Sequence, residues 1–208
     1  MKLPRVSGYV LAGGESSRMQ VLGTAAVDKA LLSFHGQTLL ELALGKVRAV
    51  CGDAAILGGP AERCARLSRY GRVVRDRIEQ AGPLAALQAA LLDSDNDWVF
   101  LVPVDLPLLP QIALRELLDM PVYYEQPTVV CYEAEGREQP LPVLIHRSAM
   151  GEVERALENG ERKLMPVLRR FAKESGGPYF LQLQRLRNHD WFMNVNTPEE
   201  LRAAEAVI

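Results

Sequence analysis

The chain has 208 residues, of which 48% are hydrophobic and 24% charged, and this composition excludes an intrinsically disordered protein. The formal net charge of −2 gives no support to a general nucleic-acid-binding protein, for which an excess of Lys and Arg is typical. The 3 cysteines and 3 histidines are too scattered for a disulfide framework or a zinc site, so we expect them to be structural or surface residues.

Short apolar runs alternate in the first half of the chain with longer segments of helical periodicity. Strands are predicted over 6–11, 54–57, 72–75 and 98–104, and helices over 38–50, 61–70, 83–92 and 110–120. The run at 98–104 is apolar throughout, which is typical of a strand buried on both faces of a parallel sheet. This alternation predicts a three-layer α/β fold, in which helices cover both faces of a doubly wound, mostly parallel sheet.

The second half of the chain is less regular. Strands are predicted over 128–133 and 142–146, on either side of a turn at Glu135 and Gly136, and they would form a small antiparallel addition to the sheet. Further helices are predicted over 148–157, 163–171 and 198–206, with Thr197 as the last N-cap and Glu200 at its capping-box position. Strands are also predicted over 179–184 and 192–195. We see no linker or repeat, and expect residues 1–208 to form one domain.

Glycines and charged side chains occur where strands are expected to end. Gly13 and Gly14 follow the first strand, where backbone N–H groups can contact a phosphate and Arg18 can add further donors. Lys29 lies in a loop of small residues, and its ammonium suits triphosphate oxygens. Asp105 follows the most apolar strand, and a carboxylate buried there needs a cation such as Mg²⁺ or a set of donors. These residues also have purely structural interpretations. Gly13 and Gly14 can form a plain turn, Lys29 can be an ordinary surface lysine, and Asp105 can cap the turn that follows its strand.

Two more pairs of residues lie near predicted strand and helix ends. Asp76 follows the third strand, where a carboxylate can accept from a ribose hydroxyl or a base, and Gly82 opens the next helix. Asn194 and Asn196 point the same way on an extended segment, so they can bind a polar heterocycle or help to place a metal. The structural alternative for Asp76 and Gly82 is an ordinary helix start, and for Asn194 and Asn196 it is a cap of the last helix. A set of regularly spaced arginines is expected on a solvated helix face, namely Arg63, Arg66, Arg69 and Arg72.

Taken in order, six motifs resemble those of the molybdenum-cofactor guanylyltransferase family, from about residue 6 to residue 201: LAGGESSRM, DKALL, AGPLAAL, PVDLP, EQPLP and NVNTPEEL. The resemblance implies a Rossmann-like nucleotidyltransferase that moves GMP from GTP to the phosphate of molybdopterin and releases pyrophosphate, with Mg²⁺ as cofactor. We expect a cytoplasmic monomer or weak homo-oligomer. We expect no nucleic-acid partner, because the chain has no excess of basic residues. We also expect no membrane partner, because no run approaches the roughly 20 apolar residues of a membrane span. Proteins that deliver the pterin are candidate partners.

The resemblance also implies roles for individual residues. Lys29, Asp105 and Arg18 would act in catalysis, and Asp105 would also bind the metal. Asn194 and Asn196 would lie on the acceptor side. The implied nucleotide-binding residues are Leu11, Ala12, Gly13, Gly14, Lys29, Asp76, Gly82 and Asp105.

The chain departs from the family pattern in three places. The segment 20–27 before Asp28 is longer than usual, Ala86 replaces the second glycine of GPLxG, and residues 56–59 contain no asparagine after the second strand. These departures leave open a sister enzyme that uses CTP or another phosphorylated acceptor, and a nucleotide-binding module without turnover. A dinucleotide-dependent oxidoreductase is disfavoured because the chain lacks GxGxxG and because that function would leave Asp105 unexplained.

Overall fold

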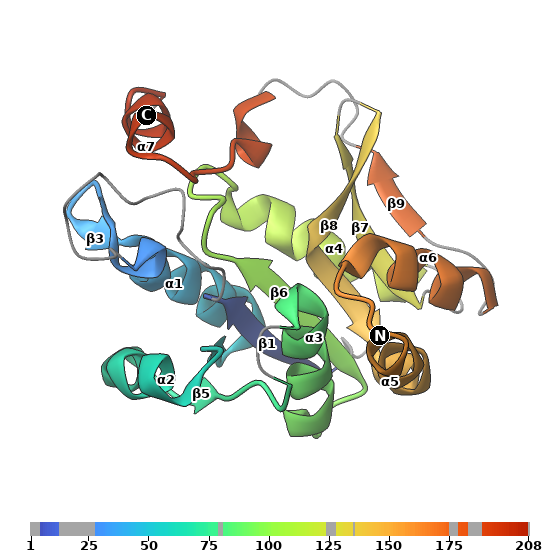
Figure 1. The fold of residues 1–208 in the computed structure, drawn as a ribbon. Coiled ribbons are helices and arrows are strands. Elements are labelled where there is room, and N and C mark those ends of the chain that lie inside the picture. Colours follow the sequence, from blue (N-terminus) through green and yellow to red (C-terminus); the bar gives the residue numbers. More distant parts are fainter. Residues whose placement is uncertain are drawn as a thin grey trace.

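The structure is a computed structural model, and it describes residues 5–12, 28–78, 81–123, 128–134, 136–174, 179–182 and 189–207. Within this part of the chain, the main sheet has seven strands in the order β5-β4-β1-β6-β8-β7-β9 (Figure 1). The strands are β1 (Val6–Leu11), β4 (Ala55–Leu57), β5 (Val73–Val74), β6 (Trp98–Pro103), β7 (Val129–Ala134), β8 (Arg137–His146) and β9 (Tyr179–Gln182).

The sheet is mostly parallel. β5, β4, β1 and β6 run in one direction, and β7 and β9 also pair in parallel with each other. β8 is antiparallel to both of its neighbours, β6 and β7. The predicted fold class is therefore confirmed, including the antiparallel addition in the second half.

Helices cover both faces of this sheet (Figure 1). The α-helices are α1 (Leu39–Cys51), α2 (Ala61–Leu67), α3 (Gly82–Asp93), α4 (Gln111–Tyr123), α5 (Met150–Glu158), α6 (Leu164–Glu174) and α7 (Pro198–Glu205). Because strand side chains alternate, Tyr9 and Leu11 of β1 pack with α3, α5 and α6, whereas Val10 packs on the opposite face with α1 and α4. Together these layers form the predicted three-layer arrangement.

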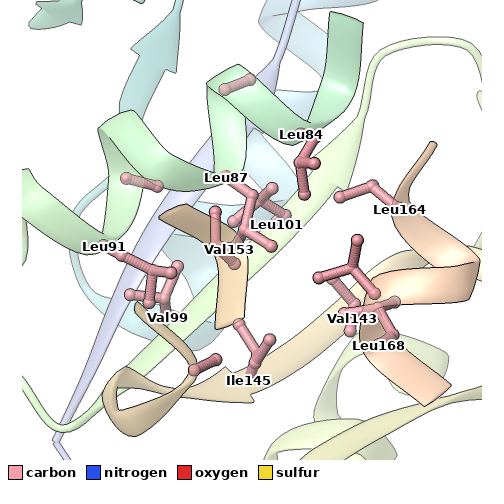
Figure 2. Packing of buried hydrophobic residues seen from close by; sticks show 14 of the residues in the cluster. Leu84, Leu87, Leu91, Val99, Leu101, Val143, Ile145, Val153, Leu164 and Leu168 are labelled. Atoms are coloured by element: carbon pink, nitrogen blue, oxygen red, sulfur yellow. The ribbon is translucent and has the colours of Figure 1, made fainter. Parts of the chain in front are cut away.

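The core between β6, β8 and the helices α3, α5 and α6 is built from aliphatic side chains (Figure 2). Leu84 and Leu87 of α3 lie close to Leu101 of β6, while Val143 of β8 meets Leu168 of α6 (Figure 2). All five side chains are 2% exposed or less, so this layer holds α3 firmly on the sheet.

Two local features differ from the expectation. The strand predicted over 192–195 is wrong: a 3-10 helix covers His189–Phe192, and residues 193–196 belong to no strand. The Val195 N–H donates to the carbonyl of Asp105, which lies past the end of β6 at Pro103, so this segment does not extend the sheet. A small hairpin, β2 (Ser33–Phe34) and β3 (Gln37–Thr38), was not predicted. Its turn places His35 and Gly36 at positive φ, 47° and 84°, and both strands are too short for a periodic signal. Among the described residues, none of the helices has the length and apolar character needed to cross a membrane.

Candidate active site

The carboxyl ends of β4, β1 and β6 meet at one edge of the sheet. The Ala12 N–H donates to the Leu57 carbonyl (3.3 Å), and the Val104 N–H donates to the Leu11 carbonyl (3.2 Å), so backbone hydrogen bonds continue past the strands themselves. The chain proceeds from β1 outward to β4 and β5, then crosses back to β6 on the other side of β1. A crevice at such a switch point is where ligands bind in doubly wound folds.

Lys29 joins three predicted motifs at this edge. Its Nζ donates to Asp105 Oδ2 (2.9 Å) and to Asn196 Oδ1 (2.6 Å), which lie 76 and 167 residues away along the chain. The lysine begins a 3-10 helix, Lys29–Leu31, where a loop of small residues was predicted, and the small residues of that loop, 23–26, lie outside the described residues. Asp28 caps that helix by accepting from the Ala30 N–H (3.1 Å), which fixes the backbone from which the lysine projects.

Asp105 lies in the turn after β6, and its side chain is 27% exposed, against 15% for Lys29. Its carbonyl accepts from the Val195 N–H (2.9 Å), which ties the C-terminal segment to the same turn. The described residues contain no group of three or more His, Cys, Asp or Glu side chains that could hold a metal. The Asp105 carboxylate and the Asn196 amide oxygen are nevertheless the hard oxygen donors that Mg²⁺ accepts, provided that substrate phosphates and water complete its shell. The residues present therefore fit Mg²⁺.

Asn196 is held by the cap of α7. Its N–H donates to Glu200 Oε2 (2.6 Å), as does the Thr197 N–H (3.0 Å), while the Glu200 N–H donates to Thr197 Oγ1 (3.1 Å). The predicted capping box is thus confirmed, and it fixes the backbone on which the Lys29 contact depends. Asn194 lies two residues before Asn196 and is solvent-exposed.

Arg63 of α2 is buried against the same strand ends. Its side chain is only 13% exposed, so the expected solvated face does not include it, whereas Arg66 and Arg69 are exposed. The Nε donates to Asp28 Oδ2 and the Nη2 to Asp28 Oδ1 (2.7 Å each), and the Nη2 also donates to the Ala12 carbonyl (2.6 Å). Helical spacing did not separate this arginine from its neighbours, because its partner precedes it by 35 residues.

Burial would raise the pKa of Asp28, but the hydrogen bonds and charge of Arg63, aided by the Ala30 N–H, outweigh it and hold that pKa below its ordinary value. Asp28 is therefore a buried carboxylate that stays ionised because it is paired.

Asp76 lies two residues beyond β5 and is half-buried. Burial raises the pKa of Asp76 to about 6, although the charge of Arg63 acts in the opposite direction. Its Oδ1 is buried and has no hydrogen-bond partner among the described residues. An acceptor buried without a donor is costly unless a ligand supplies one.

Gly82 opens α3 as predicted, with φ of +67°. A Cβ at this position would lie 3.3 Å from the Arg162 carbonyl, so both the backbone angle and the close approach of the segment before α6 favour glycine. No hydrogen bond described by the structure joins Gly82 to the Lys29 group. Gly13, Gly14 and Arg18 lie outside the described residues, as does segment 20–27.

The two remaining departures from the family pattern are built into the core. Ala86 is 2% exposed within α3. A Cβ on Gly58 would lie 2.8 Å from Val73 Cγ1 and 2.9 Å from Cys64 Sγ, so packing leaves no room there for an asparagine side chain.

The family model described as "MobA-like NTP transferase domain" matches residues 8–175. The chain belongs to this family. Its members include a molybdenum cofactor guanylyltransferase of Photobacterium profundum, 28% identical over 200 residues, which cover 95% of this chain and 94% of the relative. One from Aliivibrio salmonicida is 30% identical over 207 residues, covering 97% of this chain and 96% of the relative. The family resemblance drawn from the motifs is confirmed, and its class of chemistry is nucleotidyl transfer.

Solved structures share the fold of this MobA-like chain. Molybdopterin-guanine dinucleotide biosynthesis protein A from Archaeoglobus fulgidus matches with a TM-score of 0.77 at 22% identity, covering 97% of each chain. A nucleotidyl transferase from Methanothermobacter thermautotroptrophicus matches with a TM-score of 0.73 at 21% identity, again over 97% of each chain. These likenesses extend over nearly the whole length and support the fold.

Proposed function

We propose that this MobA-like protein transfers GMP from GTP to the phosphate of molybdopterin and releases pyrophosphate. The observation that carries the proposal is the double contact of Lys29 Nζ with Asp105 and Asn196, which joins three separate motifs at the switch point of the sheet. The relatives named as molybdenum cofactor guanylyltransferases, which align over nearly the whole chain, support the choice of GTP and molybdopterin.

The chemistry does not need a protein base. The acceptor is a phosphate monoester whose second pKa is about 6, so it is largely ionised at neutral pH. One of its oxygens attacks the α-phosphorus of GTP, and the bond between that phosphorus and the oxygen bridging to the β-phosphate breaks. Pyrophosphate leaves with the electron pair. The protein has to position two anions and offset their charge.

Lys29 and Asp105 have complementary tasks in this scheme. The Lys29 ammonium would bind phosphate oxygens, and the Asp105 carboxylate would hold Mg²⁺ together with those phosphates. Bound Mg²⁺ would supply charge neutralisation at the α-phosphate and at the leaving pyrophosphate. Because Lys29 Nζ is 2.9 Å from Asp105 Oδ2, both positive charges would act on the same phosphate group.

Other strand ends would orient the two substrates. The backbone around Leu11 and Ala12, where β1 ends, would lie against the nucleotide. The Oδ1 of Asp76, which has no hydrogen-bond partner among the residues that the structure describes, would accept a hydrogen bond from the ribose or the base. Asn196, beside Lys29, and the exposed Asn194 would face the acceptor. A cytoplasmic location, a monomeric or weakly oligomeric state and pterin-delivery proteins stay predictions.

Pyrophosphate release tests the proposal. The purified protein is incubated with Mg²⁺ and each of the four NTPs, with and without molybdopterin. We expect release only with GTP, only when molybdopterin is present, and none after Mg²⁺ is chelated. Release with CTP alone would instead identify the sister enzyme, and GTP binding without any release would identify a non-catalytic module.

A further inference from the structure

Arg63 lies on α2 but makes its hydrogen bonds mainly with other segments of the chain, unlike an arginine on a solvated helix face. One guanidinium donates to both carboxylate oxygens of Asp28 and to the Ala12 carbonyl, at 2.6 to 2.7 Å. A longer bond of 3.4 Å runs from Nη1 to the Gly58 carbonyl. Ala12 follows β1, Gly58 follows β4, and Asp28 precedes Lys29, so one side chain connects three segments that converge on the proposed site.

The planar fork of arginine suits this arrangement, because it can bind a carboxylate with two parallel bonds and still donate elsewhere. Asp28 in turn accepts from the Ala30 N–H and caps the 3-10 helix that begins at Lys29. The chain of contacts therefore runs from two strand ends, through Arg63 and Asp28, to the backbone that carries the phosphate-binding lysine.

We propose that Arg63 is a positioning residue of the nucleotide site, whose guanidinium fixes the Lys29 segment against the carboxyl ends of β1 and β4. The inference rests on the proposed function only for its effect on turnover, since the positioning of residues 28–32 by Arg63 can be measured without any substrate. Arg63 does not contact the reacting atoms in this scheme. Through Asp28, it fixes the position of the Lys29 ammonium.

The neighbouring arginines supply a matched control. Arg69 belongs to the 3-10 helix Ser68–Tyr70 that follows α2, is exposed, and lies over the Tyr70 ring at 4.9 Å, away from Asp28. Replacing Arg63 or Arg69 by Met removes the same charge and leaves a side chain of similar length. Only the first replacement breaks the contacts with Asp28 and Ala12.

Hydrogen exchange tests the structural part without any substrate. In Arg63→Met, the amides of Ala30, Leu31 and Leu32 should exchange at least about tenfold faster, because the bonds that protect them lose their anchor. The amides of β6 should exchange as in the wild type, and Arg69→Met should change neither group. Unchanged exchange at residues 30–32, or an equal rise in β6, would overturn the proposal.

A double variant separates positioning from mere stability. Arg63→Met leaves the buried Asp28 carboxylate with only the Ala30 N–H and the exposed Arg66, whose Nη2 is 3.8 Å from Asp28 Oδ2, and this lowers stability. Arg63→Met/Asp28→Asn removes that poorly compensated charge. We expect the double variant to regain stability to urea but to keep a kcat/KM for the nucleotide at least about tenfold below the wild type. Recovery of turnover together with stability would show that Arg63 only stabilises the fold.

Arg63→Lys keeps the charge but not the fork, and it decides the matter if the Met variant fails to fold. It should show the same local rise in exchange at residues 30–32, and protection at the wild-type level would overturn the proposal. If the wild type releases no pyrophosphate with any NTP, the proposed function fails, but the exchange experiment still decides the role of Arg63.

Discussion

The Oδ1 of Asp76 is buried and has no hydrogen-bond partner among the described residues, and burial raises the pKa of this carboxyl to about 6. An aspartate whose folded pKa is raised binds its proton more tightly in the native state than in the unfolded chain. The free energy of unfolding therefore falls as the pH rises from about 4 to about 6, and this loss is complete at neutral pH.

Asp76→Asn should consequently stabilise the protein at neutral pH. We expect the free energy of unfolding to rise by on the order of 1 kcal/mol at pH 7, after the shift is discounted for solvent screening, and to change little at pH 4. Urea unfolding at the two pH values measures this. Asp95→Asn, at an exposed position, is the control and should show no such difference. An equal effect of Asp76→Asn at both pH values would contradict the account.

The same substitution should weaken GTP binding, because an amide oxygen accepts less strongly than a carboxylate. A site residue that costs stability and contributes affinity fits the general observation that strained or destabilising groups persist where function needs them. Isothermal titration with GTP and Mg²⁺ would measure the affinity, and unchanged affinity would exclude Asp76 from the binding site.

At the scale of elements, two helices begin with the same capping box but differ in what precedes them. Thr38 and Glu41 cap α1, whereas Thr197 and Glu200 cap α7, directly after Asn196. Glu200 Oε2 also accepts from the Asn196 N–H (2.6 Å), so it holds the residue that contacts Lys29. We therefore expect the two capping boxes to contribute similarly to folding, and only the box of α7 to contribute to the proposed reaction.

Glu41→Ala and Glu200→Ala are a matched pair that tests this difference. Each should lower the free energy of unfolding by about 1 kcal/mol, the usual contribution of a helix cap. Only Glu200→Ala should also reduce kcat, by about tenfold, since a misplaced Asn196 no longer orients Lys29. Urea unfolding and steady-state kinetics give both values. Equal kinetics in the two variants would show that the α7 cap has no part in the site.

At the scale of the molecule, elements with local periodicity were predictable from the sequence. Each run of β1 and β6 was apolar enough to be recognised, and the rule for doubly wound sheets indicated that a ligand would bind where these strands end. The common role of Lys29 and Asp105 came from the family resemblance, because Lys29 does not follow a predicted strand. The strand expected at 192–195 failed because an extended run forms a strand only when a neighbour pairs with it, and Val195 makes one bond to the Asp105 turn.

Long-range polar contacts were not predictable in the same way. The role of Arg63 depends on Asp28, and the place of Asn196 depends on Lys29, and neither pairing leaves a periodic trace in the sequence. The spacing of the arginines gave a wrong prediction for Arg63, because it is typical of a solvated helix face and Arg63 is largely buried. Charged side chains reveal such roles only once the fold brings their partners together.

The proposed transfer takes place at one site, where β1 and β6 end, and it depends on Lys29 and Asp105. The most direct measurement follows the α-phosphate of GTP, radiolabelled, into a dinucleotide with molybdopterin. The wild type should transfer the label, and Lys29→Ala and Asp105→Asn should each transfer it at least about 100-fold more slowly while remaining folded. Lys173→Ala, at an exposed position on α6, should transfer it normally. Transfer at the wild-type rate by folded Asp105→Asn would contradict the account.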